Sequence, residues 1–177
     1  MYRANEVAAW IIKQSVAKGQ PITNLKLQKL LYYIQGAFLA LRDAPLFDEE
    51  ILAWKHGPVV REVYDQYKQF GESAILDTVT EIPAFTNIEE LMLTEVFARY
   101  GKFTAGQLVS KTHNETPWRD VSTNDLITKE SIQTYFSTEV YNDENMFANV
   151  PVVERLSSNS HDLSEDEYWE QELRGEI

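Results

Sequence analysis

The stretch LKLQKLLYYIQGAFLAL, residues 25–41, decides the fold of this chain. Its apolar residues recur at the three- and four-residue spacing of an α-helix, and Thr23 stands where a side chain can cap the first turn. One apolar stripe consists of Leu27, Leu30, Leu31, Ile34, Phe38 and Leu41. A second stripe, roughly opposite, consists of Leu25, Tyr32 and Leu39, with Gly36 near it. A helix that is apolar on two faces is usually buried between neighbours, so we interpret this segment as the central helix of the domain. The second stripe is then core or, alternatively, a groove for a partner.

The segment that follows, LFDEEILAWKHGPVVREVYDQYKQFG at residues 46–71, changes from one pattern to another. Its short apolar run at 51–54 predicts a strand or extended segment. Pro58 suits the first position of a helix, and Gly57 before it can take backbone angles that other residues avoid. The next apolar residues follow helical spacing as far as Gly71. The segment therefore predicts a strand that turns sharply into a helix, with Trp54 and His56 beside the corner.

Helical patterns also cover most of the remaining body. The predicted elements are a helix at about 4–18, a helix from a cap at Asn87 to about Tyr100, a helix after the capping-box pair Thr104 and Gln107, a loop or helix end at 111–118, and a last helix opened by Thr128. The predicted fold class is mainly α: a compact helical domain around a central buried helix at about 25–41, with a small β element near 51–55.

Composition limits the class of protein. The 177 residues are 44% hydrophobic and 12% aromatic, which indicates one globular domain with a real core. The sequence has no cysteine, which excludes disulfides, a thiol nucleophile and a thiolate zinc site. The first residues lack a signal-peptide pattern, and no apolar run approaches the roughly 18 residues that span a bilayer. We therefore expect a cytoplasmic protein.

The net charge of −12 is divided unequally along the chain. Residues 137–177 hold 11 acidic and 2 basic residues, which leaves only −3 on residues 1–136. The chain is thus predicted to consist of a helical domain at 1–136 and an acidic C-terminal extension at 137–177 that is partly disordered or ordered by a partner. Binding to phosphates needs a basic face, so we expect no direct contact with nucleic acid.

The sequence lacks the residue patterns of common catalytic sites. His56, His113 and His161 show no metal-ligand spacing. His56 and His113 could meet near Trp54 and Trp118, and they are interpreted as structural histidines. There is no nucleophile elbow, phosphate loop or dinucleotide fingerprint, and the acidic run at 48–50 is interpreted as a solvated turn. Lys26 and Lys29 suggest a DNA-reading helix, but its two apolar faces leave too little exposed surface. We therefore predict no enzymatic activity, no cofactor and no metal.

Several short blocks, in a fixed order, resemble a known family. They are LKLQKLLYY at 25–33, LF at 46–47, AWKHGPVVREVY at 53–64, YG at 100–101, Leu108, TH at 112–113, PW at 117–118, and an ending with Ile132, Tyr135 and Phe136. Over about residues 4–136 the chain resembles the Panacea domain of SocA-like antitoxins, a domain that also occurs in many phage-associated proteins. The acidic extension lies outside that pattern.

The resemblance implies an antitoxin of a toxin–antitoxin pair. It implies that the protein neutralises a small toxin, of a kind that often arrests translation, by direct contact between the two proteins. One alternative is an adaptor that delivers the toxin to an ATP-dependent protease. Another is a phage or mobile-element regulator that acts on a host protein, for example by mimicking DNA. Mimicry needs charges on a rigid surface, and the Ser- and Asn-rich residues before the acidic arm argue against it.

Seven residues are candidates for contact with the partner. They are Trp54, His56, Pro58, His113, Trp118, Tyr168 and Trp169. The residues from 54 to 58 are interpreted first as the joint that sets the shape of the scaffold, and second as part of a partner surface. Tyr168 and Trp169 lie in an acidic stretch at 162–172, which suits a basic surface on a toxin. Alternatively, this stretch only keeps the protein soluble.

Overall fold

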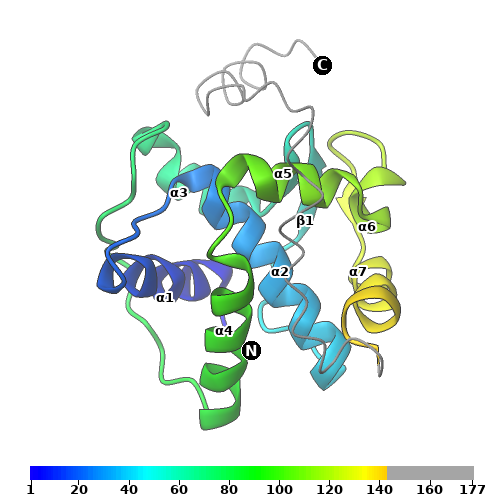
Figure 1. Cartoon of the computed structure of the whole chain (residues 1–177), viewed down its shortest axis with the longest axis horizontal. Helices are drawn as coiled ribbons and strands as arrows, with labels where there is room; N and C mark the ends of the chain where they lie inside the picture. The colour runs from blue at the N-terminus through cyan, green and yellow to red at the C-terminus, as the bar shows by residue number, and fades with distance from the viewer. Residues whose placement is uncertain (143–177) are drawn as a thin grey trace.

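The computed structural model describes residues 1–142 and is built around one long helix. This helix, α2 (Asn24–Arg42), begins at Thr23, whose side chain accepts a hydrogen bond from the Lys26 N–H at 3.3 Å. Around it lie α1 (Ala4–Ala17), α4 (Asn87–Tyr100), α5 (Ala105–His113) and α7 (Lys129–Tyr135) (Figure 1). The predicted mainly helical fold around a central helix is confirmed.

Both apolar stripes of α2 are buried, except that Leu41, at the end of the first stripe, is 41% exposed. Leu25 and Tyr32 have no exposed surface, and Leu39 is buried as well. Gly36 is required for close packing, because a Cβ atom there would lie 2.5 Å from the ring of Phe136. Phe136 opens the π-helical turn η2 (Phe136–Val140), which continues directly from α7. The interpretation of the second stripe as core is confirmed, and the groove alternative is wrong.

The predicted strand is present, but the predicted start of the next helix at Pro58 is wrong. Strand β1 (Ile51–Trp54) turns back into β2 (Gly57–Val59), with Trp54 opposite Gly57 and Ala53 opposite Pro58. Gly57 has φ +106°, which allows the tight turn. Pro58 suits an edge strand because it has no N–H to leave unpaired.

A short third strand, β3 (Leu126–Ile127), pairs with the other side of β1, so the sheet order is β2-β1-β3. The sequence did not predict it. The helix expected at Pro58 begins instead as α3 (Arg61–Tyr67), with Val60 as its N-cap. It continues as the 3₁₀ turn η1 (Lys68–Phe70) and ends at Gly71, as predicted.

Local capping signals set the other helix boundaries. Helix α4 is capped by Thr86 rather than by the predicted Asn87, because Thr86 and Glu89 form a reciprocal capping box. The predicted caps at Thr104 and Thr128 are confirmed. The segment expected to be a loop or helix end completes α5 and then forms the short helix α6 (Thr116–Arg119). Within residues 1–142, none of the helices is both long and apolar enough to cross a membrane.

Candidate partner-binding site

Trp54 joins the sheet to the helices. Its ring packs in a small apolar cluster and makes an edge-to-face contact with Tyr64 at a centroid distance of 4.8 Å. The Arg61 guanidinium lies 5.2 Å from the centroid of the same indole. The other buried members of the cluster are Leu25, Val59, Ala105 and Val109. With 9% of its surface exposed, Trp54 is mainly a packing residue.

His113 and Trp118 lie next to this cluster. Their rings are stacked at 3.9 Å with an interplanar angle of 10°. The Trp118 indole N–H donates a hydrogen bond to the backbone oxygen of Trp54 at 2.8 Å. The structure therefore brings three of the candidate residues together, and the last two are partly exposed at the corner between α5 and α6.

The other candidates are less available to a partner. His56 is 5% exposed, and Pro58 is buried in β2. Tyr168 and Trp169 lie outside the described residues, so their role stays a prediction.

The turn between β1 and β2 lies over Lys29, a buried residue with no exposed surface. Its Nζ atom donates a hydrogen bond to the Pro58 oxygen at 3.1 Å. A Cβ atom on Gly57 would lie 2.8 Å from both Lys29 Cε and Thr112 Oγ1, so the turn fits closely against α2 and α5. Sequence reasoning placed Lys29 on a candidate DNA-reading face. Its spacing from Leu25 and Tyr32, in the second apolar stripe, was the signal that it is buried.

Burial and the Lys29 charge determine the protonation of His113. Burial first, and then the positive charge of Lys29, lowers the pKa of His113 to about 4, against a hydrogen bond with the Lys55 backbone that raises it. The imidazole is therefore neutral at pH 7. A neutral ring stacked on an indole is suited to packing and hydrogen bonding rather than to an ion pair.

Glu115, which the sequence did not single out, is buried just after α5. Tyr33 donates a hydrogen bond to its Oε1 atom at 2.9 Å, and Tyr33 itself stacks on Tyr100 at 3.8 Å. Burial raises the pKa of Glu115 to about 7, against the hydrogen bond from Tyr33, which lowers it. Its neighbours in sequence, Asn114 and Thr116, suggest only a turn, so no local signal marks this residue.

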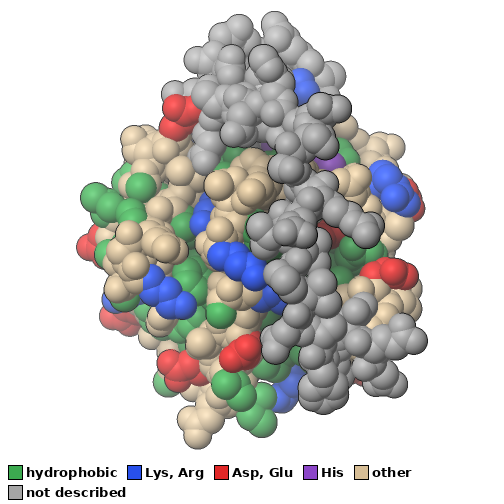
Figure 2. Space-filling view, in the orientation of Figure 1, with side chains coloured by type: hydrophobic (Ala, Val, Ile, Leu, Met, Phe, Trp, Pro, Cys, Tyr) green, Lys and Arg blue, Asp and Glu red, His purple; other side chains and the backbone are tan. Residues whose placement is uncertain are grey.

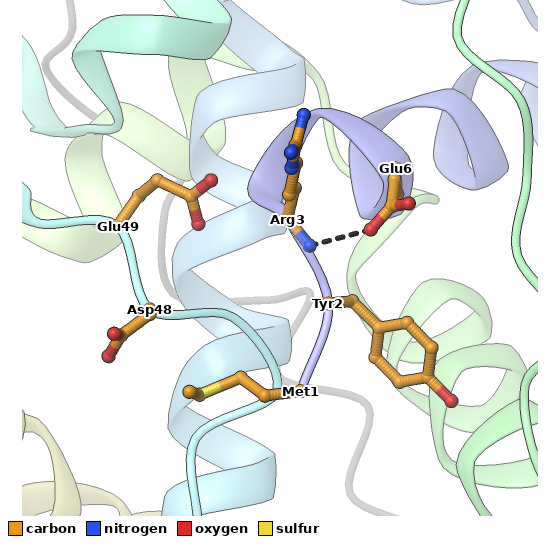
Figure 3. Close-up of a pocket in the computed structure, with 6 residues that line it drawn as sticks. All are labelled: Met1, Tyr2, Arg3, Glu6, Asp48 and Glu49. Atoms are coloured by element: carbon orange, nitrogen blue, oxygen red, sulfur yellow. Dashed lines mark hydrogen bonds between the residues drawn. The ribbon is translucent and has the colours of Figure 1, made fainter.

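The open pocket beside the N terminus has a structural explanation. It is lined by Met1, Tyr2, Arg3, Glu6, Asp48 and Glu49 (Figure 3). Glu6 accepts a hydrogen bond from the Arg3 N–H at 2.7 Å, and Glu49 accepts one from the Ala4 N–H at 3.0 Å. Asp48 pairs with Lys129. The carboxylates therefore cap α1 and fix the loop before β1, and the turn at 48–50 is more than a solvated one.

The joint of β1, β2, α5 and α6 is held by packing and by hydrogen bonds between its elements, such as the one from the Trp118 indole N–H to the Trp54 oxygen. Two aromatic rings, those of His113 and Trp118, are partly exposed there. Among residues 1–142, His, Cys, Asp and Glu side chains form no group of three or more that could hold a metal ion.

Comparisons with known proteins agree on one family. A family model described as "Antitoxin SocA-like, Panacea domain" matches residues 27–119, from α2 to the end of α6. The chain is also similar to the antitoxin SocA of Caulobacter vibrioides (strain NA1000 / CB15N), with 29% identity over 161 residues, 84% of this chain and 85% of the relative. No solved structure matches. The matched residues include the whole joint of hairpin, α5 and α6, and the chain belongs to the SocA-like antitoxin family with a Panacea domain.

Proposed function

We propose that this protein is an antitoxin that neutralises a cognate protein toxin by direct contact, without catalysis. The observation that carries the proposal is the family match over residues 27–119, which spans the joint around Trp54. The joint is held by the stacked rings of His113 and Trp118 and by the hydrogen bonds of Lys29 and Trp118 to backbone oxygens of the hairpin. Such an arrangement suits a rigid surface for protein recognition.

Two parts of the chain are proposed to share the contact. The first is the corner between α5 and α6, where His113 and Trp118 form a partly exposed stacked pair. The second is the acidic arm at 137–177, with Tyr168 and Trp169 as aromatic anchors. A toxin that acts on RNA or nucleotides needs a positive site, and acidic residues beside aromatic anchors complement such a site. The toxin is therefore proposed to be a small basic protein, and translation is its proposed target.

Co-expression in cells tests the proposal. The toxin candidate is a small basic protein encoded beside this one, and the readout is growth with and without the antitoxin. We expect the full chain to restore growth, and a chain that ends at Asn142 to stay folded but to lose most of the rescue. That end point keeps η2, which belongs to the packed body. Full rescue by the shorter chain would place the whole contact on the body.

The toxin's half-life separates masking from delivery to an ATP-dependent protease. If contact alone neutralises the toxin, its half-life in cells is unchanged or longer when the antitoxin is present. A half-life that the antitoxin shortens, and that recovers when the protease is removed, would replace masking with the adaptor role.

A further inference from the structure

Four cations gather where α4 meets α5, and together they are called the basic patch. They are Lys18, Arg99, Lys102 and Lys111. Lys26 lies beside the patch, where its Nζ atom donates a hydrogen bond to the Gly101 oxygen at 2.7 Å. In Figure 2, Lys and Arg side chains lie in the middle of the face shown. Figure 1, in the same orientation, shows the connection between α4 and α5 on this face. This concentration contrasts with the net charge of −3 on residues 1–136.

Aromatic rings lie between these cations. Lys18 Nζ is 4.8 Å from the ring centroid of Phe97. Lys102 and Lys111 both approach Phe103, at 5.5 and 5.6 Å. These distances are typical of cation–π contacts. Such contacts hold the long side chains close to the protein surface instead of extended in water.

Within residues 1–142, none of the four cations of the patch forms a salt bridge. Residues 96–114 contain no Asp or Glu. Three salt bridges are found in the described part of the chain, and they involve other cations: Lys68, Arg119 and Lys129. The patch therefore keeps an excess of positive charge that suits an anionic binding partner.

The chain itself leads from the patch to an acidic segment. Tyr141, next to the end of the described residues, has its ring centroid 5.6 Å from the Arg99 guanidinium. After the 20 residues at 142–161, the stretch 162–172 holds six acidic residues and no Lys or Arg. Twenty residues span at most about 70 Å, so the connection is long enough for this stretch to return to the patch.

We propose that the basic patch at the α4–α5 corner binds the acidic stretch 162–172 of the same chain. Opposite charges complement each other across the contact, and Tyr168 and Trp169 add rings that attract Lys and Arg. Because both partners are in one chain, the effective concentration of the arm at the patch is of the order of millimolar. A separate polyanion, such as a single-stranded nucleic acid, would have to compete with that concentration. Since the contact is between exposed charges, salt weakens it.

This contact would hold the arm in the free antitoxin, and a toxin with a basic surface would have to displace it. That consequence rests on the proposed function. The docking itself does not, because it is measured on the antitoxin alone, without a toxin and without a growth assay.

The experiment uses the full chain, which has no native cysteine. A nitroxide spin label on Ser164→Cys marks the arm, and the broadening of backbone amide signals is measured by NMR at 20 mM and 500 mM salt. We expect the amides of residues 99–111 to lose at least half of their intensity at low salt and to recover at high salt. Neutralising the patch with Arg99→Gln, Lys102→Gln and Lys111→Gln should also restore their intensity.

The matched control neutralises three exposed cations elsewhere, Arg42, Lys68 and Arg119, each to Gln. It removes the same charge, and the broadening at 99–111 should persist. If the label broadens no amide of the body, or broadens those of another face, the proposal is wrong. A second contradictory outcome is that the label leaves the amide signals of residues 99–111 sharp, while a 12-nucleotide single-stranded DNA shifts the same signals at low salt. That result would make the patch a nucleic-acid site instead.

Discussion

The backbone angle of Gly57 and the atoms packed against it both exclude a side chain at this position. Its φ of +106° disfavours any side chain, and a Cβ atom would meet Lys29 and Thr112 at 2.8 Å. A side chain at residue 57 would therefore cause both backbone strain and steric overlap, because the hairpin turn lies directly on α2 and α5.

We predict that Gly57→Ala lowers the free energy of unfolding by about 2–4 kcal/mol. The matched control is Gly19→Ala, which also has a positive φ (+68°) but no atom within 4 Å of its Cβ position. The control should cost about 1 kcal/mol, the strain of the backbone alone. Urea unfolding of the two variants measures the difference, and equal losses would show that the turn is not packed against Lys29.

Glu115 makes the stability depend on pH. Its pKa is about 7 in the folded protein, above the ordinary glutamate value of 4.5, so the folded state holds its proton more tightly than the unfolded state does. The stability that this proton provides is complete below pH 4.5 and is lost as the pH rises through 7.

We predict that Glu115→Gln, which stays neutral and keeps an acceptor for Tyr33, removes this loss. Relative to the native protein, the variant should gain on the order of 3 kcal/mol between pH 4 and pH 8. Urea unfolding at the two pH values tests this. A stability difference that is the same at both would mean that Glu115 has an ordinary pKa.

At the scale of elements, the helices were predictable because their signals are local. Thr23, Thr104 and Thr128 act as caps through bonds to residues three positions along, so the sequence alone locates them. The hairpin was not predictable in this way. A proline ring fits both a first helical turn and an edge strand, and the contacts that decide between them come from Lys29, 29 residues away.

Site residues were predictable where the residue type itself is conspicuous. Trp54, His113 and Trp118 stand out as large or titratable residues, and the fold brings them together. Lys29 and Glu115 acquire their roles only from burial by distant elements. The two residues of β3 are too few to show any periodicity.

The hairpin also gives an element-scale prediction. Trp54→Ala should lower the free energy of unfolding by about 3–5 kcal/mol, because it empties the cluster between the sheet, α3 and α5. Leu126→Ala, at an exposed position on the neighbouring strand, should cost less than about 1 kcal/mol. Thermal unfolding compares the two variants. A well-folded Trp54→Ala protein that has lost all toxin binding would instead show that Trp54 is primarily a contact residue.

At the scale of the whole molecule, the packed body reaches beyond α7. Phe136 has no exposed surface, and its ring centroid lies 5.4 Å from the ring centroid of Tyr32 and 6.0 Å from that of Tyr33. Val140 is also buried. Phe136 and Val140 of η2 are therefore a part of the core that closes over α2.

We predict that a chain ending at Asn142 keeps its stability within about 1 kcal/mol of the full protein. A chain ending at Tyr135 loses Phe136 from the core and should lose about 3–5 kcal/mol. Thermal unfolding followed by circular dichroism measures both. Equal melting temperatures would place the end of the fold before η2.

The position of Pro58 on the edge of the sheet also restricts how a partner can bind. The Pro58 oxygen is occupied by Lys29, and the N–H of Val60 is occupied by the Gln28 side chain at 2.9 Å. Proline has no N–H of its own, so this edge offers a foreign strand almost nothing to pair with. A partner cannot extend the sheet by strand addition at β2, and the same feature protects the protein from edge-to-edge aggregation. Any partner that binds at this edge therefore has to contact side chains rather than the backbone of β2.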